Sequence, residues 1–392
     1  MSAFLEKGQP PLRPALAAMT GLQAVVALAL FAPGVLAPSL GLSEAAIALF
    51  TTGCFAIGMM GALFGGGLVA RFGSFAIAMM CMAMVAVAMG LSALASPLAL
   101  AAAGMILGLA FGPETPASSA LLGRLTTRQQ APLVFSLRQT GNQLGAILGS
   151  FALPSLALVH PQLGFAVIAL MALIAIPLFA RLRLRYDGLT RTSAMIVDPR
   201  AALSLVWRHR ALRKLAIVSM PLAAMQLGLN AFLVTYLVNT LEQTHIVAGF
   251  FLGIAQAGGL FGRLGWGYVA SRFTSPHHLI AMLAFAMAMC AASLACLPTH
   301  VALPLLVALT FTFGLTASGW NGVFLSEVAR LAPVGQAGEA TGAVLTASYG
   351  GLLIGPVLIS FIAQISSLCL VYGCLALACV FAGLWMSRIR NA

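Results

Sequence analysis

The stretch Gly66–Phe72, with the sequence GGLVARF, has a counterpart in Gly267–Phe273, with the sequence GYVASRF. Each stretch closes a long apolar run and places a glycine five residues before an Arg-Phe pair. A second, weaker match relates residues 108–125 to residues 314–331. Two matches in the same order indicate an internal duplication, in which the second and fourth apolar runs of the first half correspond to the second and fourth of the second half.

The composition around these stretches is that of a membrane protein. Hydrophobic residues make up 61% of the 392 residues and charged residues only 7%, whereas soluble domains carry about 25% charged residues. A helix needs about 20 apolar residues to cross the hydrocarbon core. The apolar runs therefore predict an all-α integral membrane protein with twelve membrane-spanning helices, near residues 14–37, 43–69, 75–94, 98–122, 131–158, 163–182, 213–238, 246–270, 278–297, 302–328, 337–363 and 367–387.

The basic residues predict the orientation of these spans, because cytoplasmic loops are enriched in Lys and Arg. Alternate loops hold nearly all of the basic residues, whereas the opposite loops hold none; these lie around Gly41, Ser96, His160, Glu242, His300 and Ser366. Both termini are therefore expected in the cytoplasm, and the number of spans is expected to be even. The predicted location is a bacterial inner membrane.

A basic stretch from Arg181 to Lys214 lies midway along the chain. It predicts a cytoplasmic linker that also contacts anionic lipid headgroups. The predicted organisation is a six-helix bundle over residues 1–185, the linker over 186–212 and a second, pseudo-symmetric six-helix bundle over 213–392. The protein is expected to be a monomer.

The loop after the second span resembles the signature loop of the major facilitator superfamily, which reads Gly-x-Leu-Ala-Asp-Arg-Phe-Gly-Arg. The chain has GGLVARFGS over Gly66–Ser74, with Ala70 at the position of the family's Asp. Ser271 stands at that position in the second copy. The resemblance covers the whole chain and implies a secondary transporter that works by alternating access. It also implies gating loops that contain Gly66, Arg71 and Gly73 in the first half and Gly267 and Arg272 in the second.

Charges inside a membrane are costly, so each one calls for an explanation. Three qualify: Glu114, Arg138 and Arg263. Glu114 lies ten residues before Arg124, which places it roughly 15 Å from that edge of the membrane. Glu114 and Arg138 lie at equal distances from the turn near Thr126, so we expect them to pair. Arg263 is expected to extend toward the cytoplasmic edge and not to contact substrate.

The expected pair has two interpretations. It is either a structural salt bridge that neutralises two buried charges or a site where an anionic substrate and a proton exchange partners, with Glu114 as the proton-coupling residue. The segment Gly112–Pro116 is expected to interrupt its helix and to free backbone groups. On the fifth span, Arg138 and Asn142 fall on one helical stripe with Gln139 beside it, and these three are expected to bind substrate. The resemblance implies further substrate-binding residues at mid-depth: Gln23, Gln226, Asn230, Trp320, Asn321 and Tyr349.

Several functions are excluded or disfavoured. The chain lacks a Gly-x-x-x-x-Gly-Lys-Ser/Thr loop, so ATP-driven pumping is excluded. The six histidines lie in loops or at helix ends and the cysteines lack metal-ligand spacing, so we expect neither an enzyme nor a metal or other cofactor. The basic residues lack the aromatic interleaving of nucleic-acid surfaces, so no nucleic-acid partner is expected.

Three functions remain open. The first is a proton-coupled symporter of a small organic anion, with Arg138 as the anion anchor and Glu114 as the proton site. The second is a proton-coupled exporter of cationic or amphipathic compounds; such exporters show Gly-x-x-x-Gly-Pro on the fifth span, where this chain has Ala146 after Gly145. The third is an uncoupled facilitator or a membrane sensor.

Overall fold

The computed structural model describes residues 10–191, 198–298 and 301–388, and every regular element in these ranges is a helix. The helices of the first half and of the connection that follows it are α1 (Leu12–Leu40), α2 (Glu44–Phe72), α3 (Ser74–Ser92), α4 (Pro97–Leu125), α5 (Ala131–Val159), α6 (Leu163–Thr190) and α7 (Pro199–Arg208). Those of the second half are α8 (Arg210–Leu227), η1 (Gly228–Phe232), α9 (Leu233–Asn239), α10 (His245–Arg272), α11 (Pro276–Ala295), α12 (Leu303–Ala317), α13 (Trp320–Leu331), α14 (Ala337–Ile365) and α15 (Leu368–Ser387).

The described residues contain twelve segments that are long and apolar enough to cross a membrane, and these coincide with the twelve predicted spans. Two of the segments are composite. The seventh, Arg210–Asn239, contains α8, the π-helical turn η1 and α9. The tenth, Leu303–Leu331, contains α12 and α13, which are separated at Ser318 and Gly319. The prediction of a multi-pass, all-α membrane protein is confirmed.

The connection between the halves contains more helix than the basic sequence, read as a linker, predicted. Helix α6 continues to Thr190, eight residues beyond its predicted end. The predicted linker, 186–212, therefore covers the last turn of α6, the short helix α7 and the first residues of α8, while residues 192–197 lie outside the described ranges. Helix α7 buries Ala202 and Val206 and leaves Trp207 exposed, which gives it one apolar face toward the bundle.

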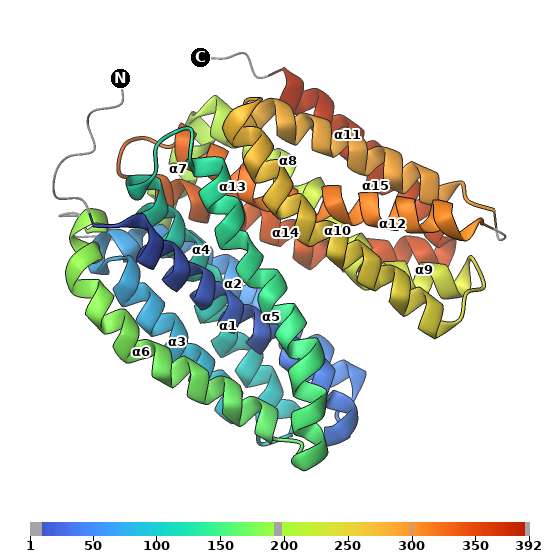
Figure 1. Ribbon diagram of the computed structural model, residues 1–392, viewed down its shortest axis with the longest axis horizontal. Helices are drawn as coiled ribbons and strands as arrows, with labels where there is room; N and C mark the ends of the chain where they lie inside the picture. The colour runs from blue at the N-terminus through green and yellow to red at the C-terminus, as the bar shows by residue number, and fades with distance from the viewer. Residues whose placement is uncertain (1–9, 192–197, 299–300, 389–392) are drawn as a thin grey trace.

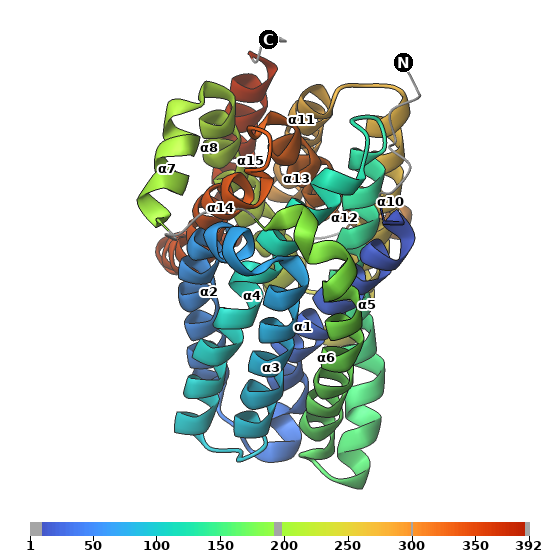
Figure 2. The same cartoon turned by 90° about the vertical axis from the view of Figure 1, so that its left-hand side faces the viewer.

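The helices form two groups, and each group has its own buried apolar cluster. One cluster is formed by α1–α6, and the other by α7–α15 together with Leu122 of α4 and Val134 and Phe135 of α5. Figures 1 and 2 show the two groups side by side, with α1 beginning and α15 ending at the same end of the molecule. We call this the basic end, because Arg71, Arg124, Arg272 and Arg330 all lie in the last turns of helices that finish there.

The two groups meet near the basic end through glycines. Gly66 on α2 lies so close to the backbone of Glu339 on α14 that a Cβ atom would overlap it. Gly267 on α10 and Gly322 on α13 lie equally close to Ser136 on α5, where an added Cβ atom would also overlap. Toward the opposite end the ribbons of the two groups separate (Figure 1). The arrangement is a pair of helical bundles joined at the basic end.

Candidate functional site

The centre of the first half holds a buried ion pair. The Nη2 atom of Arg138 on α5 donates to Oε2 of Glu114 on α4, and the two side chains are 1% and 3% exposed. Thr115 completes the cluster: its Oγ1 donates to Glu114 Oε1 at 2.8 Å and accepts from Arg138 Nη1 at 3.2 Å. The predicted pairing of the two intramembrane charges is thus present, and the hydroxyl links both partners.

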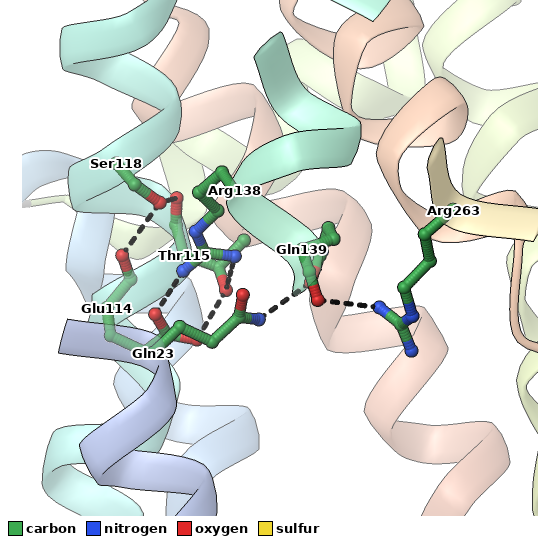
Figure 3. Close-up of polar contacts among 7 residues, drawn as sticks. All are labelled: Gln23, Glu114, Thr115, Ser118, Arg138, Gln139 and Arg263. Atoms are coloured by element: carbon green, nitrogen blue, oxygen red, sulfur yellow. Dashed lines mark hydrogen bonds and ion pairs between the residues drawn. The ribbon is translucent and has the colours of Figure 1, made fainter. Parts of the chain in front are cut away.

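Two glutamines extend this cluster toward the second half. The side-chain amides of Gln23 on α1 and Gln139 on α5 approach each other within 2.6 Å, and both side chains are buried. Gln139 follows Arg138 in the chain, so the pair of amides lies beside the ion pair, as Figure 3 shows. Gly141, two residues further on α5, packs against the backbone of Thr20. This close contact of α1 and α5 holds the two glutamines within reach of each other.

Helix α4 is not interrupted at Gly112–Pro116, so that expectation was wrong. Pro113 and Pro116 both lie inside the continuous helix Pro97–Leu125. The proline rings fit because α2 offers glycines there: a Cβ on Gly61 or Gly65 would lie 3.2 or 3.0 Å from Pro113. The unbroken helix fixes the depth and direction of the Glu114 side chain between two prolines.

The second half forms a cluster without charge at the matching depth. Oε1 of Gln226 on α8 accepts from the Trp320 indole Nε1 at 3.2 Å and from Asn321 Nδ2 at 3.0 Å. Here the helix is interrupted, one residue before Trp320. Side chains accommodate the backbone groups at the break, since Trp266 Nε1 donates to the Leu315 carbonyl at 2.8 Å and Asn321 Nδ2 to the Ser318 carbonyl at 3.4 Å. Side-chain donors on backbone carbonyls are a recognised cause of helix breaks.

A chain of amides connects the two halves. Gln256 on α10 donates to Oδ1 of Asn230 at 2.9 Å and accepts from Gln143 on α5 at 3.2 Å. Asn230 lies within the π-helical turn η1, and such turns occur frequently at functional sites. Asn142 is half-buried and has no side-chain hydrogen bond among the described residues. Gln256 was not among the predicted site residues, although a glutamine within an apolar run was a usable signal.

Tyr349 on α14 is buried and stacks at an angle on Phe111 of α4, with 5.3 Å between the ring centroids. This aromatic contact lies one turn from Glu114 in the sequence of α4. The predicted candidates therefore fall into two groups, a charged group on the first half and an amide and indole group on the second, with Tyr349 and Gln256 between them.

Arg263 does not extend to the basic edge, so the prediction for this residue was wrong. Its side chain is 1% exposed, and Nη1 donates to the backbone carbonyl of Gln139 at 3.0 Å. Figure 3 shows the Arg263 side chain directed from α10 toward the Gln139 segment of α5. A side chain that turns into the contact between the bundles cannot reach the membrane edge.

The predicted gating residues divide by exposure. Gly66 and Gly267 form the close contacts described above, whereas Arg71 and Arg272 are exposed. Gly73 has a φ of +99°, and a Cβ there would overlap the carboxylate of Asp187 on α6.

An acid thus stands near the loop although Ala70 replaces the family's Asp. Asp187 accepts hydrogen bonds from the backbone amides of Phe75 at 2.7 Å and Ala76 at 3.1 Å. It caps the first turn of α3, where the positive end of the helix dipole favours a carboxylate. The sequence gives no signal for this role, because Asp187 falls within the predicted linker.

The protein has two helical bundles that are joined at one end, and each bundle contributes polar side chains at mid-depth. This arrangement is typical of membrane transporters that bind their substrate between two bundles. The sequence model of the Major Facilitator Superfamily matches residues 15–356. The chain belongs to the Major Facilitator Superfamily, and it is a transporter and not an enzyme. A search of curated proteins finds no match.

Solved structures share the fold at low sequence identity. The E. coli fucose:proton symporter is 16% identical, with a TM-score of 0.78 over 97% of this chain and 99% of that chain. The human organic anion transporter MFSD10 is 17% identical, with a TM-score of 0.75 over 96% and 100%. A bacterial homologue of the iron transporter ferroportin, in an outward-facing state, is 14% identical, with a TM-score of 0.77 over 96% and 98%. These similarities establish the fold.

Proposed function

We propose that this protein is a secondary active transporter that moves a small organic anion across the bacterial inner membrane, coupled to protons. The observation that carries the proposal is the buried Glu114–Arg138 ion pair beside the contact between the bundles. A charge inside a membrane protein marks a substrate or proton pathway by default. The known transport of protons with fucose, and of organic anions, by proteins of this fold makes both chemistries compatible with it.

The proposed coupling uses the competition for one guanidinium. While Arg138 pairs with Glu114, the carboxyl is held as a carboxylate. A substrate anion that approaches Arg138 takes over part of this interaction, and Glu114 then takes up a proton. Proton and anion are released together when the bundles rock about the site. Gln23, Gln139 and Thr115 supply hydrogen-bond donors and acceptors both to the Glu114–Arg138 pair and to the bound anion.

We also propose an orientation and a state. The basic end is cytoplasmic, because its helix ends carry the arginines. The bundles are joined at that end through Gly66 and Gly267, so the structure corresponds to the outward-facing state. Residues Gln226, Asn230, Trp320, Asn321 and Tyr349 then contribute to binding from the second half.

The test uses purified protein in proteoliposomes, with currents recorded on solid-supported membranes at two pH values. Organic acids should give pH-dependent currents in the wild type, and Arg138→Ala should abolish them. Glu114→Gln should retain exchange of labelled for unlabelled acid, since exchange moves no net proton, but should lose the pH dependence. Glu242→Gln is the matched control, because that carboxyl lies in an exposed loop at the other end of the molecule.

Two other outcomes would support one of the alternative functions instead. Currents with cationic dyes alone, together with tolerance of Arg138→Ala, would support an exporter of cationic or amphipathic compounds and contradict the anion proposal. Uptake of acids without any pH dependence would support an uncoupled facilitator.

A further inference from the structure

Arg263 differs from Arg138 in having no carboxylate. Both guanidinium groups are 1% exposed, and both lie beside the Arg138–Gln139 segment of α5. Arg138 has Glu114 as its ion partner. Among the described residues no Asp or Glu lies within ion-pair distance of Arg263, whose hydrogen bond goes to a neutral backbone carbonyl. The buried cluster around the Arg138–Gln139 segment therefore holds two cations and one anion among the described residues.

Among the acids whose side chains the structure describes, no other takes this position. Asp187 caps α3, and Glu327 pairs with Arg330. Glu242 lies in an exposed loop at the other end of the molecule, and Glu339 lies at the start of α14, near the basic end. A buried charge is costly without a partner of opposite sign. The uncompensated charge of Arg263 thus calls for an anion that is not part of the described protein.

The free part of the guanidinium has the shape that a carboxylate needs. Nη1 is used by the Gln139 carbonyl, whereas Nε is buried and has no hydrogen-bond partner. No hydrogen bond of Nη2 occurs among the described residues. The Nε and Nη2 groups of an arginine present two parallel N–H donors, which match the two oxygens of a carboxylate. The edge that remains is therefore the edge that binds carboxylates in a bidentate manner.

We infer that Arg263 binds the carboxylate group of the transported substrate, and that it is the anion anchor contributed by the second half. This inference rests on the proposed function and deepens it. The bound carboxylate lies beside Gln139, on the boundary between α10 and α5, so the anion contacts both bundles. Arg263 then holds the substrate from the second half, while Arg138 remains the guanidinium for which the substrate and Glu114 compete.

The test measures thermal unfolding of the purified, full-length protein in detergent. The probes are three monocarboxylates, lactate, benzoate and nicotinate, each compared with its neutral amide: lactamide, benzamide and nicotinamide. The variants are Arg263→Met, which removes the charge, and Arg263→Lys, which keeps it without the planar edge. Arg185→Gln is the control, because Arg185 is an exposed arginine of α6.

We expect at least one acid, and none of the amides, to raise the unfolding midpoint of the wild type and of Arg185→Gln. Arg263→Met should unfold at a higher temperature than the wild type without ligand, because an unpaired buried charge has been removed. Its apparent affinity for the acid should fall roughly 10- to 100-fold. Arg263→Lys should bind the acid more weakly than the wild type and show no gain in midpoint.

The failures are distinguishable. If Arg263→Met binds the acid with wild-type affinity, or unfolds at a lower temperature without ligand, the role of Arg263 is structural and the inference is wrong, while the proposed anion transport stands. If no acid stabilises the wild type but cationic dyes do, the proposed function itself is wrong, and the inference falls with it.

Discussion

Glu114 and Trp320 occupy matching positions of the internal repeat, yet they lie in different surroundings. Glu114 sits on an unbroken helix and forms an ion pair with Arg138, with Thr115 bonded to both. Trp320 sits at the first residue after a helix break and shares an amide oxygen of Gln226 with Asn321. The first half places its charges on continuous helices, and the second half places neutral donors where the helix is interrupted.

This difference indicates a division of tasks. A buried ion pair offsets the lost hydration of its two charges only while the charged groups stay in close, well-aligned contact. Continuous helices α4 and α5 provide that geometry. The amide and indole cluster carries no net charge, so a change in its geometry costs less. We therefore expect the first half to move as a rigid unit and the second half to adjust around the substrate.

The largest expected effect comes from breaking the charged side of this comparison. Arg138→Met leaves Glu114 buried without its cation, so the free energy of unfolding should fall by about 3–5 kcal/mol. The double variant Glu114→Gln/Arg138→Met carries no buried charge at this site and should regain most of that stability, but not transport. Chemical denaturation in detergent and uptake in proteoliposomes measure the two effects separately. A double variant as unstable as the single one would contradict the assignment of an ion pair whose partners depend on each other.

Much of the fold was predictable from the sequence, because the hydrocarbon core imposes a length of about 20 apolar residues on each span. The pairing of Glu114 with Arg138 was predictable for a related reason: two adjacent helices joined by a short turn place residues equidistant from that turn at the same depth. In both cases a single physical constraint, membrane thickness or helical rise, acts along the chain.

The direction of Arg263 was not predictable in this way. Spacing along α10 gives the depth of the residue, but not which neighbouring helix its face meets, and the partner, the Gln139 carbonyl, is a backbone atom of the other half. The continuity of α4 was missed for a similar reason. Whether Pro113 interrupts a helix depends on the space that Gly61 and Gly65 leave on α2, and this is a property of packing.

A second, intermediate effect concerns the contacts that join the halves. Gly66→Ala places a methyl group against the backbone of Glu339, which cannot move aside, whereas Gly267→Ala meets the Ser136 side chain and the Pro132 carbonyl. Both variants should favour the state in which the basic end is open, and Gly66→Ala should do so more strongly. The reporter is Ala337→Cys, at the first residue of α14 and next to Gly123 of α4. We expect Gly66→Ala to raise the rate at which a maleimide labels this cysteine about tenfold, the equivalent of about 1.4 kcal/mol.

The control for these variants is Gly188→Ala on α6, where an added Cβ meets no atom within 4 Å. It should leave the labelling rate unchanged relative to the same cysteine variant of the otherwise native protein. Equal labelling in all three alanine variants would show that the two glycine contacts do not set the balance between the states, and that the halves are joined by other contacts.

The smallest expected effect tests the neutral side of the comparison. Trp320→Phe keeps the aromatic ring but removes the Nε1 donor to Gln226, so one hydrogen bond worth about 1 kcal/mol is lost. Transport should show a KM about fivefold higher with little change in the maximal rate, because the adjustable half binds the substrate but does not carry the proton. Trp385→Phe is the matched control, since the Trp385 Nε1 atom has no hydrogen-bond partner among the described residues, and it should leave KM unchanged. If Trp320→Phe instead lowers the maximal rate and leaves KM as it was, the indole acts in the conformational change, and the division of tasks between the halves does not hold.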